Sequence, residues 1–230
     1  MRQEELQEAC KVDQLFHQLE ETLAKELLEQ VTYPWEALKG IHDLILKLGP
    51  TLPEDIYEER EPQIWIARSA KVYPTATILA PAIIGPDTEV RPGAFIRGNA
   101  LVGSGCVIGN STELKNVIIF NSVQVPHYNY VGDSILGYHS HMGAGSITSN
   151  VKADKTPVTV KAGEAGIPTG LKKFGAILGD WVEIGCNTVL NPGTVVGRKS
   201  HVYPVSMVRG MVPADSIYKK QGEVAQLREN

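Results

Sequence analysis

The sequence lacks a long apolar run. No window of its 230 residues approaches the roughly 18 to 20 consecutive apolar residues that a membrane-spanning helix needs. Residues 1–11 carry Arg2, Glu4, Glu5 and Glu8, where a signal peptide would need an apolar segment. We therefore expect a cytoplasmic protein without a membrane span.

Cysteine is also scarce. The three cysteines, Cys10, Cys106 and Cys186, are an odd number and lie far apart in the sequence. This pattern indicates neither a disulfide framework nor a cysteine zinc site.

A strong charge of either sign is missing as well. The net charge is −4, but residues 1–62 hold 15 acidic and 6 basic residues, which leaves 11 acidic and 16 basic residues for residues 63–230. A mildly basic body without dense Lys/Arg clusters fits a small anionic ligand and argues against nucleic acid.

Residues 1–62 have a helical pattern. Apolar residues at steps of three to five predict one amphipathic helix that ends at Thr32 and a second that begins at Pro34 and stops at Gly49. The acidic residues 51–62 are expected to form a linker. We interpret 1–62 as a helical hairpin and linker that serve packing or oligomerisation. The apolar positions are Leu6, Cys10, Leu15, Phe16, Leu19, Leu23, Leu27 and Val31, then Trp35, Leu38, Ile41, Leu44, Ile45 and Leu48.

From residue 66 on, aliphatic residues fall at every sixth position. Neither the helical period of about 3.6 nor the strand period of about 2 explains this repeat. It is expected of a triangular solenoid, in which each hexad forms one short parallel strand and a corner. The aliphatic side chains then point to the axis, and the repeats supply their own core, so we expect the solenoid to fold without residues 1–62. The positions are Ile66, Val72, Ile78, Ile84, Val90, Ile96, Val102, Ile108 and Leu114 and, after an interruption over 115–177, Leu178, Ile184, Leu190, Val196, Val202 and Val208.

This repeat resembles that of the hexapeptide-repeat acyltransferase family, whose members fold as a left-handed parallel β-helix. The resemblance implies an all-β fold of this kind over residues 63–213, preceded by the helical appendage and followed by a C-terminal tail, 214–230. An inserted loop is expected at about residues 156–173, which are rich in Gly, Lys and Pro. This loop either closes over a site or decorates the surface.

Three segments of the chain are not required by a solenoid: ELKN at 113–116, VPHYNYVGD at 125–133 and MGAGSITSN at 142–150. They closely resemble the acetyltransferase domain of bifunctional N-acetylglucosamine-1-phosphate uridyltransferases, which is a glucosamine-1-phosphate N-acetyltransferase. The uridyltransferase domain is expected to be missing. The resemblance implies transfer of an acetyl group from acetyl-CoA, as co-substrate, to an amino-sugar 1-phosphate in nucleotide-sugar or cell-envelope precursor synthesis, such as UDP-N-acetylglucosamine biosynthesis.

By the same resemblance, His127 is the general base that takes a proton from the amine of the acceptor. Histidine suits this role because imidazole gains and loses a proton near neutral pH. Lys115 and Tyr130 match residues that hold the sugar phosphate, and Lys155 matches a lysine near the acceptor.

The phosphate-binding arginine of the family has two candidates here. Arg91 lies in the Arg-Pro-Gly motif that the family uses, but it precedes Lys115 by four hexads, whereas Arg97 precedes it by three. Three hexads make one turn, so Arg97 is expected to stack on Lys115 at about 4.8 Å. We therefore predict that Arg97 binds the phosphate.

On the cofactor side, the resemblance places the backbone of Ala144 at the acetyl thioester, where its N–H stabilises the oxyanion. Asn150 matches an acetyl-CoA contact. Cys186 and Pro204 stand where the family has serine and alanine contacts with the cofactor.

His141 departs from the family, which has an acceptor-contacting asparagine at this position. An imidazole still donates or accepts a hydrogen bond, so His141 is expected to contact the acceptor, while the identity of that sugar is left open.

Two alternatives remain at this stage. His127, His139 and His141 suggest a zinc site of the kind found in hexapeptide-repeat carbonic anhydrases, although their spacing fits that family poorly. The other alternative is a non-catalytic protein that binds a sugar phosphate or nucleotide sugar, or serves as a scaffold for a separate nucleotidyltransferase.

The family resemblance also implies a homotrimer. In the family the cofactor lies between neighbouring solenoids, so a single chain would hold half a site.

Overall fold

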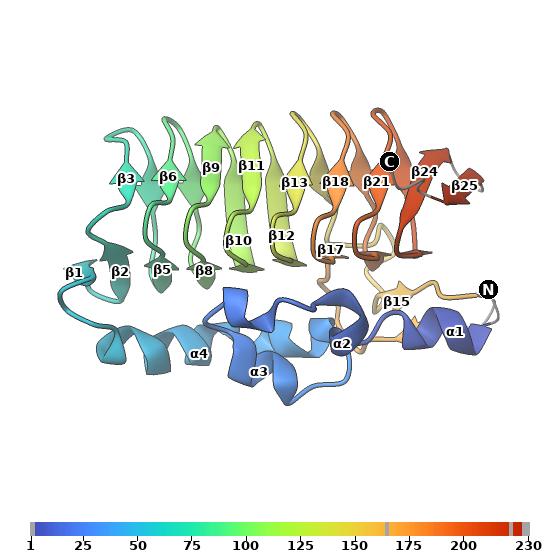
Figure 1. Cartoon of the computed structure of the whole chain (residues 1–230), viewed down its shortest axis with the longest axis horizontal. Helices are drawn as coiled ribbons and strands as arrows, with labels where there is room; N and C mark the ends of the chain where they lie inside the picture. Colours follow the sequence, from blue (N-terminus) through green and yellow to red (C-terminus); the bar gives the residue numbers. More distant parts are fainter. Residues whose placement is uncertain (1–2, 164–165, 221–222, 227–230) are drawn as a thin grey trace.

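The computed structural model describes residues 3–163, 166–220 and 223–226. Short strands wind into a parallel solenoid, and the helices lie together along one side of it (Figure 1). No helix in the described ranges is long and apolar enough to cross a membrane. The helical elements are α1 (Gln3–Glu8), α2 (Val12–Leu15), η1 (Leu19–Glu21), α3 (Lys25–Glu29), η2 (Pro34–Gly40), α4 (Ile41–Leu48) and η3 (Gly49–Thr51).

The strands are mostly two to five residues long. They are β1 (Tyr57–Glu61), β2 (Ile64–Ala67), β3 (Lys71–Val72), β4 (Thr77–Ile78), β5 (Ala82–Ile84), β6 (Glu89–Val90), β7 (Phe95–Ile96), β8 (Ala100–Val102), β9 (Val107–Asn110), β10 (Glu113–Ile119), β11 (Gln124–His127), β12 (Tyr130–Leu136), β13 (His141–Met142), β14 (Ile147–Thr148), β15 (Thr159–Val160), β16 (Ile167–Pro168), β17 (Ala176–Leu178), β18 (Glu183–Ile184), β19 (Val189–Leu190), β20 (Thr194–Val196), β21 (His201–Val202), β22 (Met207–Val208), β23 (Met211–Val212), β24 (Ser216–Lys220) and β25 (Glu223–Gln226).

The parallel strands form three faces. The β11 face contains β3, β6, β9, β11, β13, β18, β21 and β24. The β14 face contains β4, β7, the first halves of β10 and β12, then β14, β19 and β22. The covered face contains β2, β5, β8, the second halves of β10 and β12, then β17, β20 and β23. Strands β10 and β12 bend from the β14 face into the covered face, so one corner of the solenoid lies within each of them.

The hexad prediction is confirmed. Of the fifteen predicted axial residues, all except Val72 and Ile78 at the first turn are buried, with an exposed fraction of at most 3%. Burial of each such side chain stabilises the fold by about 1.5–3 kcal/mol, so the sequence repeat is itself the core of the solenoid.

The interruption at 115–177 is shorter than predicted. The solenoid continues through it with turns that are one residue shorter than three hexads, because Glu113 pairs with Tyr130 and Tyr130 with Ile147. The next partner of Ile147 is Val189, much further along the chain than one turn, so an inserted segment follows β14. A one-residue shortening is enough to hide a hexad in the sequence while the strands stay in register.

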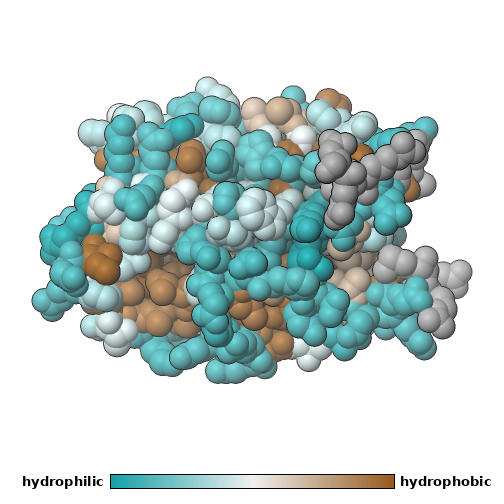
Figure 2. Space-filling view, viewed as in Figure 1, coloured by the Kyte–Doolittle hydropathy of each residue, from teal (hydrophilic) through white to brown (hydrophobic). Residues whose placement is uncertain are grey.

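The covered face is buried on both sides. Its strands β5, β8, β17 and β20 are buried at every residue, whereas two-residue strands of the other faces, such as β7 and β18, alternate exposed and buried. The outer cover is the N-terminal segment, residues 3–56, whose Phe16 ring stacks on Phe120 at 4.9 Å and whose Trp35 ring lies 5.6 Å from Phe174. Figure 2 shows this segment in the lower half of the view, where polar surface surrounds apolar patches.

The prediction of one continuous helix before Thr32 is wrong. The chain breaks after α2 because the buried carboxylate of Asp180, distant in the sequence, accepts the backbone N–H groups of His17 and Gln18 at 2.7 and 3.1 Å. These two N–H groups are then unavailable to the helical carbonyls four residues earlier. The second helix does begin at Pro34, but as the 3₁₀ helix η2, where Glu36 accepts the N–H of Tyr33 at 2.9 Å, and it continues as α4.

The segments predicted as a linker (51–62) and as a C-terminal tail (214–230) both contain strands. Residues 57–61 form β1, which pairs antiparallel with β2, and β24 pairs in parallel with β21 as a further rung of the β11 face. The solenoid sheet therefore extends beyond the predicted boundaries at 63 and 213.

The described residues of the insertion pack against the solenoid, at a corner other than that of His127. Its strands β15 and β16 form an antiparallel pair, and Val158 and Val160 are buried beside the last turns of the solenoid. Lys161 accepts the backbone N–H of Met211 at 2.8 Å. The insertion thus extends the cover that the N-terminal segment begins, on the side away from His127.

Candidate active site

His127 is the last residue of β11, at the corner between the β11 face and the β14 face. This corner lies at the edge of the solenoid farthest from the helices, along the top of the view in Figure 1. The side chain is exposed, and among the described ranges (3–163, 166–220, 223–226) it has no hydrogen-bond partner. Its own backbone N–H donates to Asn129 Oδ1 at 3.1 Å, which fixes the turn that follows. An imidazole held in this way has both ring nitrogens open to a ligand.

Four predicted site residues share this corner. Successive turns of the solenoid are joined there by backbone hydrogen bonds, so the residues form one column, which we call the His127 column: His127, Ala144, Cys186 and Pro204. The carbonyl oxygens of His127, Ala144 and Cys186 accept the N–H groups of Gly145, Asn187 and Val205 at 3.0, 2.8 and 2.9 Å. The structure thus brings the predicted base together with three of the predicted cofactor contacts.

The backbone N–H of Ala144 is open in this column. Within the described part of the chain it donates to no group, although its neighbour Gly145 donates to His127. A free N–H one turn from an exposed imidazole is suited to stabilise negative charge that develops on a carbonyl oxygen.

A second group of predicted residues surrounds Asp133, at the corner where β12 bends. Lys115 Nζ lies 3.1 and 3.2 Å from the two carboxylate oxygens of Asp133, and Asn150 Nδ2 donates to one of them at 2.6 Å. Asn150 also donates to the hydroxyl of Tyr130 at 3.2 Å. Burial raises the pKa of Tyr130, and Asp133 and Glu113 act in the same direction, so the phenol stays a neutral donor.

Arg97 lies one turn from Lys115, as its spacing predicts. Ile96 is in register with Leu114, and the N–H of Arg97 donates to the carbonyl of Leu114 at 2.8 Å. The Arg97 guanidinium is partly exposed and contacts Glu113 at 2.7 Å. Arg91 instead follows β6 on the β11 face and contacts Glu89 at 3.0 Å. Only Arg97 shares a column with Lys115.

Two predicted residues lie apart from both groups. His141 begins β13 on the β11 face, in register with Gln124 at the opposite end of β11 from His127, and its Nδ1 lies 2.8 Å from Glu183 Oε2. Lys155 is exposed in a turn at the start of the insertion, where its N–H donates to Lys152. The structure does not bring either side chain to the His127 column within one chain.

The histidines of the zinc alternative are also separated. His139 stacks on Trp181, with ring centroids 4.1 Å apart, and His141 faces Glu183. In residues 3–163, 166–220 and 223–226, no group of three or more His, Cys, Asp or Glu side chains has the geometry to hold a metal ion.

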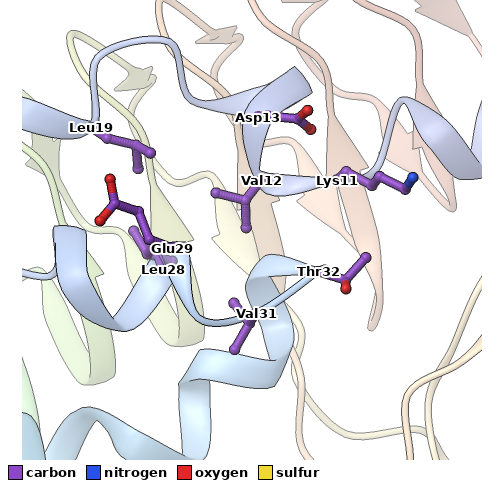
Figure 3. A pocket seen from close by; sticks show the side chains of 8 residues that line it. All are labelled: Lys11, Val12, Asp13, Leu19, Leu28, Glu29, Val31 and Thr32. Carbon is purple, nitrogen blue, oxygen red and sulfur yellow. The ribbon is translucent and has the colours of Figure 1, made fainter.

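Two of the hollows on the described surface differ in their position relative to the predicted site. One, of about 340 Å³, lies within the N-terminal segment (Figure 3). Its lining includes Lys11, Asp13 and Leu28, none of which is a predicted site residue. The other, of about 400 Å³, opens beside Asn150 and is lined in part by Lys152, Asn191 and Arg209. Of these two, the second is lined by Ser149 and Val151, the sequence neighbours of the predicted site residue Asn150.

Two residues to which the resemblance gives no role, Asp133 and Asn116, contact the predicted site residues or one another. Asp133 is 5% exposed and contacts Lys115 and Asn150, and Asn116 donates to Asp133 at 3.0 Å. Both residues have positive φ, 54° at Asn116 and 47° at Asp133, as corner residues require. The sequence signal for this role was the Gly-Asp pair at 132–133. Asp133 lies close to Lys115 in the solenoid, and a buried carboxylate needs a cationic partner.

Cys186 provides a native chemical probe of the His127 column. Cys10 and Cys106 are buried, and burial raises the pKa of both thiols to about 12, whereas Cys186 is exposed. Because the thiolate is the reactive form, we expect iodoacetamide at about pH 8 to modify Cys186 and spare the other two. Saturating acetyl-CoA is expected to slow this reaction at least severalfold, as measured by peptide mass spectrometry. Equal rates with and without acetyl-CoA would remove Cys186 from the cofactor contacts.

Comparison with known proteins finds a matching family and curated relatives for the solenoid. A family model described as "GMPPB C-terminal domain" matches residues 78–214. The chain is 34% identical over 141 residues to a Methanococcus vannielii protein named "Bifunctional protein GlmU", and 30% identical over 128 residues to a Sulfurisphaera tokodaii protein named "Bifunctional sugar-1-phosphate nucleotidylyltransferase/acetyltransferase". These matches cover 61% and 56% of this chain, and 34% and 32% of the relatives. The chain thus spans about a third of the length of these curated relatives.

Among solved structures, the hexapeptide transferase family protein from Anaplasma phagocytophilum is similar to 71% of this chain, over 78% of its own length. The TM-score is 0.40 and the sequence identity is 16%.

Proposed function

The chain belongs to the GMPPB C-terminal domain family, and we propose from this premise and its site that it is an acetyl-CoA-dependent N-acetyltransferase for an amino-sugar 1-phosphate. The observation that carries the proposal is the His127 column. Along one corner it aligns the His127 imidazole and the Ala144 N–H, neither of which has a hydrogen-bond partner in the described residues, with two further predicted cofactor contacts. The name of the Sulfurisphaera tokodaii relative supports sugar-1-phosphate and acetyl-transfer chemistry, although both relatives are about three times as long as the matched segment.

In the proposed reaction the acceptor lies across β12 on the β14 face. Its phosphate contacts Lys115 and Arg97 at one end of the face, and its amine reaches the His127 corner at the other. Tyr130 and Gly132 are two residues apart on this strand, roughly 7 Å. This separation suits a single sugar ring with a phosphate on one side and an amine on the other.

The proposed chemical step is a direct acyl transfer. His127 accepts a proton from the acceptor amine while the nitrogen lone pair attacks the thioester carbonyl of acetyl-CoA. The Ala144 N–H stabilises the resulting oxyanion. Collapse breaks the carbon–sulfur bond, His127 returns the proton to the departing sulfur, and the products are the N-acetyl sugar phosphate and CoA.

We further propose that the active form is a homotrimer. The corner that carries His127 also exposes apolar side chains, with Tyr128 65% and Val205 80% exposed. A neighbouring solenoid packed against this corner would bury these side chains and form the other half of the cofactor site. His141 and Lys155, which are distant from His127 within one chain, are then candidates to reach the acceptor of a neighbouring copy.

The proposal is tested by incubating the full chain with acetyl-CoA and glucosamine 1-phosphate and detecting the N-acetyl product by mass spectrometry. Unphosphorylated glucosamine is the control acceptor. We expect product from the phosphorylated sugar, and we expect Arg97→Ala to raise its KM about tenfold or more, because a charge-assisted contact is lost. Arg91→Ala is the matched control and should leave KM nearly unchanged, since Arg91 lies on another face.

Three outcomes are informative. Equal losses in the two arginine variants would show that the phosphate does not sit over the Arg97 and Lys115 column. Binding of the sugar phosphate without product would favour the alternative of a non-catalytic binding or scaffold protein. Absence of both binding and product would exclude the proposed acceptor class.

A further inference from the structure

Asp133 is a buried carboxylate at the centre of the proposed acceptor site. It is 5% exposed and lies where β12 bends between the β14 face and the covered face. One oxygen accepts Lys115 Nζ at 3.1 Å and Asn116 Nδ2 at 3.0 Å, and the other accepts Lys115 Nζ at 3.2 Å and Asn150 Nδ2 at 2.6 Å. These contacts use the full accepting capacity of the carboxylate.

The corner geometry alone does not require a charge at this position. The register places Asn99, Asn116, Asp133 and Asn150 in one column of successive turns. The other three members are neutral amides, and Asn99 and Asn116 adopt the same positive φ as Asp133 without a charge. A carboxylate costs more free energy to bury than an amide, so its presence at one rung needs a reason beyond the turn.

The carboxylate fixes the orientation of both predicted ligand-binding groups. The Lys115 ammonium has three N–H donors, and Asp133 holds it against the corner with at least one donor left over for an anion. The Asn150 amide donates to Asp133 and to Tyr130, so its carbonyl oxygen faces away from the carboxylate and is the end left for a ligand. Tyr130 accepts from Asn150, which leaves its own O–H free to donate.

Lys115 and Asn150 form no hydrogen bond with each other within the described residues; each reaches Asp133. A carboxylate that both groups share is therefore the physical link between the proposed phosphate contact and the proposed cofactor contact.

We propose that Asp133 is a positioning residue that presents a cation at Lys115, a hydroxyl donor at Tyr130 and an amide acceptor at Asn150 to the two substrates. This inference rests on the proposed function. It adds that binding of the sugar phosphate and binding of acetyl-CoA depend on the same buried carboxylate.

The test compares Asp133→Asn with a matched control, Asp180→Asn. Asp180 is equally buried, at 2% exposed, and holds the N-terminal segment, far from the His127 column. Steady-state kinetics with glucosamine 1-phosphate and acetyl-CoA are measured on both variants, together with thermal unfolding. We expect Asp133→Asn to raise the KM of the sugar phosphate about tenfold or more and that of acetyl-CoA severalfold, with a smaller change in kcat. Asp180→Asn should lower the unfolding temperature and leave both KM values near those of the unaltered chain.

A purely structural role for Asp133 would lower the amount of active protein, and thus kcat, without moving KM. Unchanged KM values in Asp133→Asn, or equal shifts in Asp180→Asn, would overturn the inference. If Asp133→Asn does not fold, the pair Lys115→Met and Asn150→Ser tests the same link: their effects on acetyl-CoA affinity should be non-additive, because both act through Asp133, and strict additivity would overturn it.

Failure of the proposed function is distinguishable from failure of this inference. If the unaltered chain makes no product, direct calorimetric titration with glucosamine 1-phosphate replaces the kinetic assay. Binding that Asp133→Asn weakens at least tenfold supports the positioning role without turnover. No binding to the unaltered chain overturns both proposals.

Discussion

The His127→Ala variant is expected to turn over roughly a hundredfold or more slowly than the unaltered chain, with acetyl-CoA affinity nearly unchanged. The reason is the position of the side chain at the exposed end of β11, where it has no hydrogen-bond partner in the described residues and lies one turn from Ala144. Removing it takes away a proton acceptor and no part of the core. Single-turnover measurements with saturating acetyl-CoA, together with a binding titration, separate the chemical step from cofactor binding.

His141→Asn is the comparison for this variant, because it removes the other histidine assigned to the site and restores the family's asparagine. We expect it to preserve the chemistry and shift acceptor preference toward glucosamine 1-phosphate. Unchanged activity in His127→Ala would exclude His127 as the base, and abolished activity in His141→Asn would transfer the role to His141.

Deletion of residues 1–62 is expected to abolish the soluble, folded state, which reverses the expectation from the hexad pattern. The deletion uncovers the outer side of the covered face, including Ile118, Phe120 and Phe174, which are fully buried. Each such side chain returned to water costs about 1.5–3 kcal/mol. A few of them together match the whole stability of a typical domain, about 5–15 kcal/mol.

The deletion is checked by size-exclusion chromatography and binding of a hydrophobic dye. A point substitution tests the same contact without removing the whole segment. Trp35→Ala removes one fully buried ring that packs against Phe174 and should lower the free energy of unfolding by about 3–5 kcal/mol in a denaturant titration. Lys47→Ala, at an exposed position of α4, is the control and should change stability little. A soluble, cooperatively unfolding fragment 63–230 would mean that the repeats alone suffice.

The solenoid could be predicted because its information is local and repeated. Each hexad specifies one strand and one corner, and the same register propagates from turn to turn, so counting three hexads was enough to stack Arg97 on Lys115. The count failed only where the turns shorten by a single residue and where the insertion follows β14. The predicted contacts Ala144, Cys186 and Pro204 came instead from the family resemblance, because the steps from His127 to Ala144 and from Ala144 to Cys186 are not three hexads long.

The site was predicted in part. The family resemblance pointed to His127, Lys115 and Tyr130, and the structure adds that they lie at two different corners on either side of the β14 face. The resemblance could not point to Asp133, since the role of this carboxylate depends on which side chains surround it. Nor does the sequence reveal that His141 faces Glu183 within the chain.

The sequence by itself determined the axial core and the register of the regular hexads, because a periodic pattern fixes both which side chains face the axis and which residues stack. The candidate base His127 lies in the interruption of this pattern and came from the family resemblance. Only the tertiary structure decided what covers the outer surface. The N-terminal helix breaks where Asp180 captures the N–H groups of His17 and Gln18, and the insertion packs beside β23. These contacts join segments that are distant in the sequence and share no repeat. Whether the helix continues past residue 16 depends on whether these N–H groups bond to helical carbonyls or to the Asp180 carboxylate. Asp180 reaches them only in the folded chain.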